Sequence, residues 1–111
     1  MKQFLLIFRN NVQTLEFQPS LQELQEAARE WQNWFGGIAA QNKLVRPLQR
    51  WDPRGIVISR EKAWTGPYVE LKECIGGLMI IQAHDYGDAL EIARDCPALL
   101  TGGNVEIRMA V

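Results

Sequence analysis

Two glutamates that lie three positions apart, Glu70 and Glu73, are the first residues of this sequence that could do chemistry. They belong to the segment V-E-L-K-E, in which Lys72 lies between them. Carboxylates that are held close together can have their pKa values pushed apart, which suits one as an acid and the other as a base. The alternative interpretation is a solvated charged segment in which Lys72 offsets its neighbours. From these residues alone, both interpretations stay open.

The single histidine, His84, is a weaker candidate. It lies beside Asp85, and we interpret it as a loop residue near the start of a helix. Zinc usually takes three or four protein ligands, and His84 has no second histidine to join it, so we expect no bound metal. The sequence also lacks the G-x-G-x-x-G, P-loop, G-x-S-x-G and H-E-x-x-H motifs. We therefore expect no cofactor, and nothing indicates nucleotide hydrolysis, hydride transfer or serine hydrolysis.

Tryptophans are the candidate ligand contacts, since the chain has four of them in 111 residues. Trp31 lies on the apolar stripe of an expected helix, and Trp34 lies next to it, so the pair could line a cleft between this helix and the sheet. Trp64 could edge that cleft or a subunit interface. Aromatic residues with a few polar groups are typical of a small-molecule pocket, but equally of an interface. Arg108 is the candidate anchor for an anionic ligand.

Composition and charge place the chain among single-domain globular proteins, with one domain over residues 1–111. Hydrophobic residues make up 47% and charged residues 23%, which is ordinary for a soluble domain of this length. The net charge is −1, the pI is about 5.8, and lysine and arginine form no run. We therefore expect no direct binding to nucleic acid.

Apolar runs in this sequence are too short for the membrane. None approaches the roughly 20 residues that a membrane-spanning helix needs. The N-terminal run of five apolar residues, 4–8, is shorter than the core of a signal peptide. We expect no membrane association and a cytoplasmic location, where Cys74 and Cys96 would be free thiols that pack as small apolar groups.

The first half of the chain predicts a strand and a long helix. Residues 2–9 form a continuous apolar run that is typical of a central strand. Ser20 and Glu23 form a capping box that begins a helix, which we expect to end near residues 41–42. The apolar stripe of this helix consists of Leu21, Leu24, Ala28, Trp31, Phe35 and Ile38. Two glycines inside it, Gly36 and Gly37, should weaken or bend the helix.

The second half predicts the remaining strands and one more helix. Residues 43–51 read as a second strand, the turn at 52–55 joins it to a third strand at 55–59, and the two are expected to pair as a hairpin. Thr65-Gly66-Pro67 is a break, residues 68–72 a short extended piece, and 75–83 a fourth strand. Asp85 can cap a second helix to about residue 95, because Pro97 cannot continue it. Alternation over 105–109 predicts a half-buried final strand.

This order, β-α-β-β-β-α-β, predicts an α+β fold of the ferredoxin-like, split βαβ type. Both helices must then cover one face of an antiparallel sheet. The other face stays partly bare, and a sheet with an apolar uncovered face usually finds a partner.

Residues 65–111 also carry a family resemblance. The matching pieces are Gly66-Pro67-Tyr68, Glu70, Lys72-Glu73, Ile75-Gly76-Gly77, Asp88-Ala89, Cys96-Pro97, Gly103 and Val105-Glu106-Ile107-Arg108. In this order they resemble the C-terminal half of the YCII-related family, in the branch named for a D-G-P-F motif. The resemblance implies a small ferredoxin-like protein whose two copies pack sheet to sheet as a dimeric α+β barrel, and therefore a homodimer.

A catalytic pair of the wider family is broken here. In that family a histidine on the first helix and an aspartate in a D-P motif after the second helix are proposed to form a dyad, which could act as general base and orienter. By the resemblance, Asp95 stands where the D-P aspartate would, with Cys96 inserted before the proline, and the histidine position falls near Trp31. The expected first helix contains no histidine. Asp95 stays a catalytic candidate by resemblance, and its alternative role is to end the second helix.

The D-G-P-F motif itself is altered. Thr65 replaces its aspartate, and Tyr68 replaces its phenylalanine conservatively. The change removes a carboxylate that could have capped the turn or joined a site with Glu70 and Glu73. Thr65 can still make a weaker hydroxyl-to-backbone turn contact. Tyr68 is counted with the tryptophans as a candidate ligand contact.

Three functions fit these observations. The leading hypothesis is a dimeric module that binds a small molecule or regulates, without robust catalysis of its own. The alternative is a cofactor-independent enzyme of the lyase, isomerase or oxygenase type, with a carboxylate acid/base in a cleft between helix and sheet; it rests on analogy between folds. The third is a structural interaction partner that has no ligand.

Overall fold

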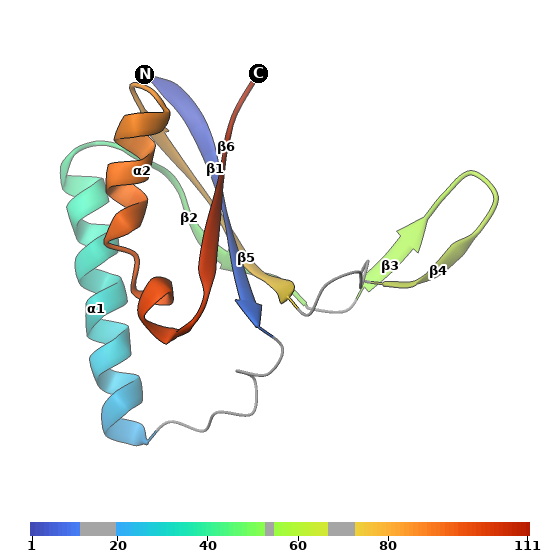
Figure 1. The fold of residues 1–111 in the computed structure, drawn as a ribbon, viewed down its shortest axis with the longest axis horizontal. Helices are drawn as coiled ribbons and strands as arrows, with labels where there is room; N and C mark the ends of the chain where they lie inside the picture. Colours follow the sequence, from blue (N-terminus) through green and yellow to red (C-terminus); the bar gives the residue numbers. More distant parts are fainter. Residues whose placement is uncertain (12–19, 53–54, 67–72) are drawn as a thin grey trace.

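The computed structural model describes residues 1–11, 20–52, 55–66 and 73–111 of the chain, which form an α+β fold (Figure 1). In chain order, the elements are β1 (Lys2–Asn11), α1 (Leu21–Ala40), β2 (Leu44–Arg50), β3 (Gly55–Ile58), β4 (Ala63–Gly66), β5 (Glu73–Ala83), α2 (Tyr86–Arg94), the 3-10 helix η2 (Pro97–Thr101) and β6 (Asn104–Met109). No helix in these ranges is long and apolar enough to span a bilayer.

The main sheet has four strands in the order β2-β5-β1-β6, and each neighbouring pair is antiparallel. With α1 following β1 and α2 following β5, this is the split βαβ arrangement, so the predicted ferredoxin-like fold class is confirmed. β1 lies between β5 and β6, the central position that its continuous apolar run predicted.

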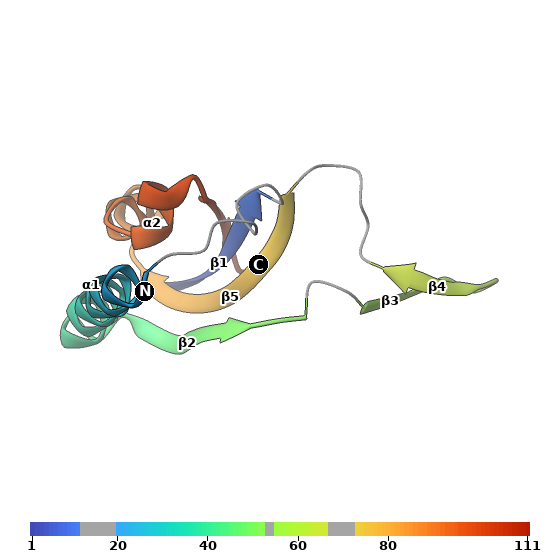
Figure 2. The ribbon, with the colours of Figure 1, turned by 90° about the horizontal axis from the view of Figure 1, so that it is seen from below.

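Both helices lie on the same side of the main sheet (Figure 2). Successive side chains of a strand point to opposite faces, so alternate residues of β1 and β5 meet the helices. Leu5 and Ile7 alternate with the core residues of β1 and lie on the face away from the helices, opposite Ile80 and Leu78 of β5. The core on the helix side consists of Phe4, Leu6, Phe8, Trp34, Ile38, Met79, Ile81, Ala83, Ala89, Cys96 and Ala98.

Helix α1 begins as predicted but packs over only part of its length. The Ser20 hydroxyl accepts from the backbone N–H of Glu23 at 3.1 Å, which confirms the N-cap. Three residues of the apolar stripe do not reach the core: Leu21 and Leu24 are 72% and 53% exposed, and Ala28 is exposed as well. A helix of 20 residues is about 30 Å long, and the first turns of α1 extend past the sheet, which leaves this end of the stripe in water (Figure 1).

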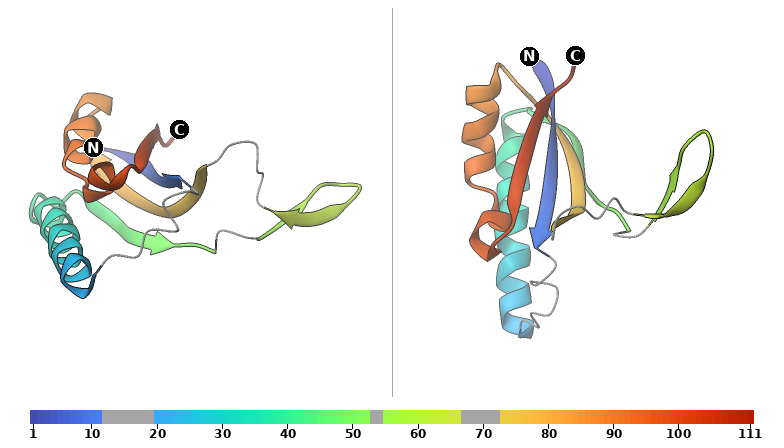
Figure 3. Two further views of the ribbon diagram at one scale, coloured as in Figure 1. Left: turned by 60° about the horizontal axis from the view of Figure 1, so that its bottom comes forward. Right: turned by 45° about the vertical axis from the view of Figure 1, so that its right-hand side comes forward.

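β3 and β4 form a separate two-stranded sheet, which we call the arm (Figure 3). The predicted hairpin between the second and third strands is therefore wrong. β3 pairs with β4 from Gly55↔Gly66 to Ile58↔Ala63, and β2 pairs with β5. The predicted turn falls between the end of β2 at Arg50 and the start of β3 at Gly55, and Thr65-Gly66, predicted as a break, belongs to β4.

The second βαβ half agrees closely with its prediction. Asp85 is the N-cap of α2, accepting from the backbone N–H of Asp88 at 2.8 Å, and Asp95 is the C-cap. Cys96 is buried behind it, and this burial raises the pKa of its thiol to about 11, so it packs as a neutral apolar group, as expected. In β6, the alternate residues Val105, Ile107 and Met109 pack on the core. The 3-10 helix η2 was not predicted.

Candidate functional site

A groove of about 680 Å³ runs between α1 and α2 and is closed at one end by η2. Its lining residues are Glu30, Asn33, Trp34, Gly37, Ile38, Gln41, Asp88, Glu91, Ile92, Asp95, Pro97 and Leu100. The α1 members recur at steps of one, three and four, because one face of a helix collects residues at these spacings. The groove is therefore built from two stretches of chain that the sheet holds side by side.

The wall of the groove is apolar at its base, where a hydrogen bond joins the two helices. Trp34 and Ile38 of α1 are both buried, and Ile92 of α2 packs against the same core. The indole Nε1–H of Trp34 donates to the backbone carbonyl of Ile92 at 2.9 Å. This carbonyl belongs to the last turn of α2, where carbonyls have no partner within the helix, so the indole satisfies it and joins the two helices.

An aromatic cluster fixes the orientation of Trp34. Its ring lies edge-to-face with Phe8 of β1 at 6.1 Å and with Trp31 at 5.8 Å between centroids, and 5.6 Å from Phe35. Aromatic pairs of this kind contribute about 0.5–1.5 kcal/mol each beyond the area that they bury. Trp31 thus supports the groove from behind, while Trp34 forms part of its wall.

The rim of the groove is acidic. Four of the lining residues are carboxylates, Glu30, Asp88, Glu91 and Asp95, and no lysine or arginine is among the lining residues that the structure describes. Glu91 pairs with Arg94 at 3.3 Å, but both side chains are well exposed, and such a pair contributes little. The rim therefore presents negative charge above an apolar floor.

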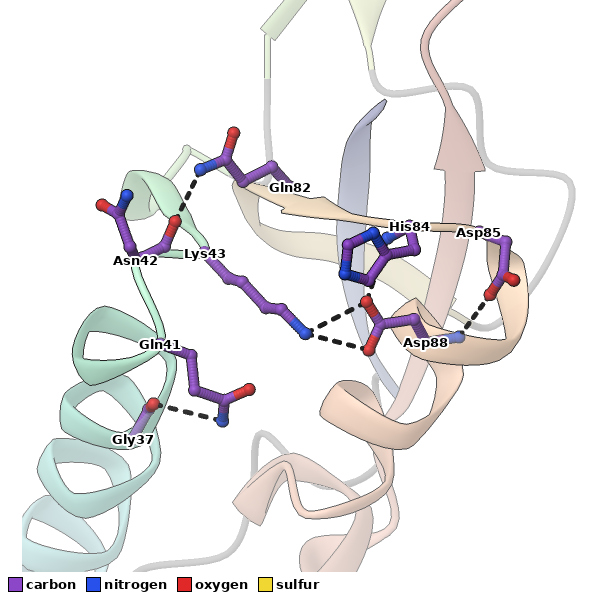
Figure 4. Close-up of polar contacts among 8 residues, drawn as sticks. All are labelled: Gly37, Gln41, Asn42, Lys43, Gln82, His84, Asp85 and Asp88. Atoms are coloured by element: carbon purple, nitrogen blue, oxygen red, sulfur yellow. Dashed lines mark hydrogen bonds and ion pairs between the residues drawn. The ribbon is translucent and has the colours of Figure 1, made fainter. Parts of the chain in front are cut away.

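Asp88 is the carboxylate whose charge is compensated (Figure 4). Its oxygens accept from the backbone N–H of His84 at 2.9 Å and from the Lys43 ammonium at 3.0 and 3.1 Å. The His84 N–H first, and then Lys43, hold the pKa of Asp88 below its ordinary value. Lys43 precedes β2, and its carbonyl accepts from the backbone N–H of Gln82 at 2.7 Å, so this ion pair fastens the start of α2 to the sheet.

Replacing Asp88 by asparagine should lower the free energy of unfolding by about 1–2 kcal/mol at neutral pH, because charge-assisted hydrogen bonds from Lys43 and His84 are lost at a partly buried position. The folded pKa is lowered, so the carboxylate stabilises the protein above its ordinary value of 3.8 and loses this contribution as the pH falls through the folded pKa. Urea unfolding of both proteins at several pH values should show the difference at pH 7 and its disappearance in acid. An equal difference at pH 2.5 would contradict the assignment, and Glu91→Gln is the control.

Comparison with protein families decides what kind of domain carries this groove. The family profile of the YCII-related domain matches residues 4–110, nearly the whole chain. The chain belongs to the YCII-related domain family. The resemblance in residues 65–111 is thereby confirmed over a longer stretch. A search of curated proteins finds no match.

Few of the residues selected from the sequence meet in this YCII-related domain. Trp34 and Asp95 line the groove together. Trp64 lies on β4 in the arm, with the Lys62 ammonium 5.2 Å from its ring centre. Glu70 and Tyr68 lie outside the described residues, and only the backbone of Glu73, at the start of β5, is described.

Arg108 lies on β6, on the sheet face away from the helices, and is not among the residues that line the groove. Its guanidinium donates to Glu106 at 3.0 Å, and Arg9 contacts the other carboxylate oxygen at 3.4 Å. Arg108 and then Arg9 lower the pKa of Glu106. In this structure the predicted anion anchor is thus engaged by a carboxylate of its own strand.

Sequence reasoning missed most of the acidic rim of this YCII-related domain. Asp88, Glu91 and Asp95 recur at steps of three and four along α2, and Glu30 lies on the α1 face that meets them. Such spacing is also typical of a solvated helix face. The signal that could have separated the two cases is the buried tryptophan between the carboxylates, and only the packing of the two helices shows it.

Proposed function

We propose that this YCII-related domain is a homodimeric small-molecule-binding module and that its ligand binds in the groove between α1 and α2. The observation that carries the proposal is the groove itself, about 680 Å³ in volume with Trp34 and Ile38 in its wall. Small-molecule sites are typically concavities of about 300–1,000 Å³ with an apolar lining and a few polar groups.

The charge of the rim indicates the class of ligand. Glu30, Glu91 and Asp95 place carboxylates around an aromatic floor, while Asp88 is compensated by Lys43. An anion would meet repulsion there, whereas an amine on an apolar body would pair with the carboxylates and pack on the tryptophan. The ligand that fits this groove best is an amphipathic cation.

Catalysis by a carboxylate finds no support in the described residues. A general acid at neutral pH needs a raised pKa, and the two carboxylates whose pKa is shifted, Asp88 and Glu106, have it lowered. The carboxylates first selected for this role, Glu70 and Glu73, are not among the described side chains. Binding without catalysis is therefore the function that we propose.

The open sheet face supports the homodimer. Leu5, Leu78 and Ile80 lie half-buried on the side of the sheet that neither helix covers, around Ile7, which is only 6% exposed (Figure 2). An apolar sheet face is stable in water only when another layer covers it. A second copy that presents the same face would cover it by a two-fold axis, the commonest symmetry of protein oligomers.

Two glycines of α1 offer a matched test of the groove. A Cβ atom added at Gly36 or at Gly37 meets no atom within 4 Å, but only Gly37 lines the groove. We expect Gly37→Phe to fill the groove and to weaken binding at least tenfold, and Gly36→Phe to leave binding unchanged. The probes are 1-naphthylmethylamine and, as its anionic counterpart, 1-naphthylacetate, followed by calorimetric titration.

Wild-type protein should bind the amine in preference to the carboxylate. If both glycine variants bind the amine with equal affinity, the groove is not the binding site. If the wild-type protein prefers the carboxylate, the proposed class of ligand is wrong, although the groove can still be the binding site.

A further inference from the structure

The arm exposes a strongly apolar face. Ile56 and Ile58 of β3 are 80% and 79% exposed. Their strand partners, Thr65 and Ala63, are exposed on the same face, because side chains alternate along each strand. Val57 and Trp64 oppose each other on the other face and are half-buried. One face of the arm is thus half-buried, and the other presents two β-branched apolar side chains to water.

Among the described residues, the core of the main sheet and its helices does not extend into the arm. A lone two-stranded hairpin is marginally stable in water. The core cluster of the described residues includes no member of β3 or β4. Burial of the two isoleucine side chains against a second surface would remove their apolar area from water and so stabilise the arm.

The accessible surface area of the chain is large for its mass, which leaves room for a contact with a second protein surface. The accessible surface is 8430 Å², whereas a compact monomer of 12.7 kDa exposes about 6200 Å². The radius of gyration is 15.6 Å, against about 13 Å for a compact chain of this length. The excess, roughly 2200 Å², exceeds the ~800 Å² that one partner contributes to a standard interface. The chain is therefore extended enough for a second copy to bury an interface of ordinary size on it.

The arm extends beyond the open face of the main sheet, on the side away from the helices (Figures 1 and 2). A second copy that covers the open face comes to lie beside the arm. From this geometry we infer that the arm clasps the second copy, with Ile56 and Ile58 packed on the partner's body. This inference rests on the homodimer proposed above. It adds that each copy packs its arm on the other copy, which we call arm exchange.

The test removes the apolar face of the arm and leaves the body intact. We expect Ile56→Lys/Ile58→Lys to raise the dimer dissociation constant at least 100-fold in sedimentation equilibrium, because two ammonium groups would be buried in the interface. Leu21→Lys, which changes a similarly exposed leucine on α1, is the matched control and should leave the constant unchanged. Ile56→Thr/Ile58→Thr keeps the preference for strand and should raise the constant at least tenfold.

Each result decides between the parts of the proposal. A dissociation constant that both double variants share with the wild-type protein would overturn the arm exchange while keeping the homodimer. A monomeric wild-type protein at 100 µM would overturn both. Ligand binding in the groove is measured separately with the Gly37→Phe variant, so its failure is distinguishable from either result.

Discussion

Trp34→Ala is expected to lower the free energy of unfolding by about 3–5 kcal/mol, a large part of the total stability of a domain of this size. The side chain is only 8% exposed, and the substitution leaves a cavity between α1, α2 and the sheet. The substitution also removes the contacts of Trp34 with three aromatic neighbours and leaves the Ile92 carbonyl without its hydrogen-bond donor. Guanidinium unfolding of the two proteins measures the difference.

Trp34→Phe separates packing from hydrogen bonding. The phenyl ring keeps much of the aromatic contact but cannot donate to Ile92, so we expect a smaller loss of about 1–3 kcal/mol. Trp31→Phe is the matched control, because Trp31 is only partly buried and stacks on the same cluster. A loss below 1 kcal/mol for Trp34→Ala would contradict the view that this residue joins the two helices.

Reversing the charge of the rim should reverse the class of ligand. We expect Glu91→Lys/Asp95→Lys to weaken binding of 1-naphthylmethylamine about 10–100-fold and to strengthen binding of 1-naphthylacetate, since each carboxylate near the ligand contributes about 1 kcal/mol at a partly exposed site. Calorimetric titration of both probes measures the change.

A control for net charge uses two exposed glutamates elsewhere. Glu26→Lys/Glu61→Lys alters the charge of the protein by the same amount, but neither residue lines the groove. If this control shifts the two affinities as much as the rim variant does, the effect comes from the field of the whole protein, and the local role of the rim is wrong.

Much of the fold follows from local patterns in the sequence. The alternation in 105–109, the run in 2–9 and the caps Ser20 and Asp85 each act over a few residues, and each was confirmed. Strand pairing is different, because a turn signal shows only that the chain bends. β2 ends at Arg50 and pairs with β5, which follows the arm in the sequence, so the local hairpin signal could not give the partner.

The burial of Trp31 and Trp34 shows a second limit of what the sequence can predict. A single stripe through α1 includes Trp31 and passes beside Trp34, yet Trp34 is the more buried. The reason is that α1 packs on the sheet and also on α2, so its buried face is wider than one stripe and is turned towards the second helix. Periodicity reports that a helix has a buried face, but its centre depends on which neighbours cover it.

The groove depends on this same helix pairing. Its rim residues Glu30, Glu91 and Asp95 each lie on a helix face that resembles a solvated surface in the sequence. Only the ferredoxin-like topology, which places both helices on one face of the sheet, brings them around Trp34. The family match supports this topology, while the ligand class comes from the side chains of this chain alone.

The most direct test of the binding site is a titration of ¹⁵N-labelled protein with 1-naphthylmethylamine, observed through the tryptophan indole N–H signals. We expect saturable shifts of the Trp34 indole signal and the Gly37 amide, with the Trp64 signal unchanged. The Gly37→Phe variant should lose these shifts. Shifts confined to Trp64 or other residues of the arm, or a Trp34 signal that stays fixed to saturation, would contradict ligand binding in the groove between the two helices.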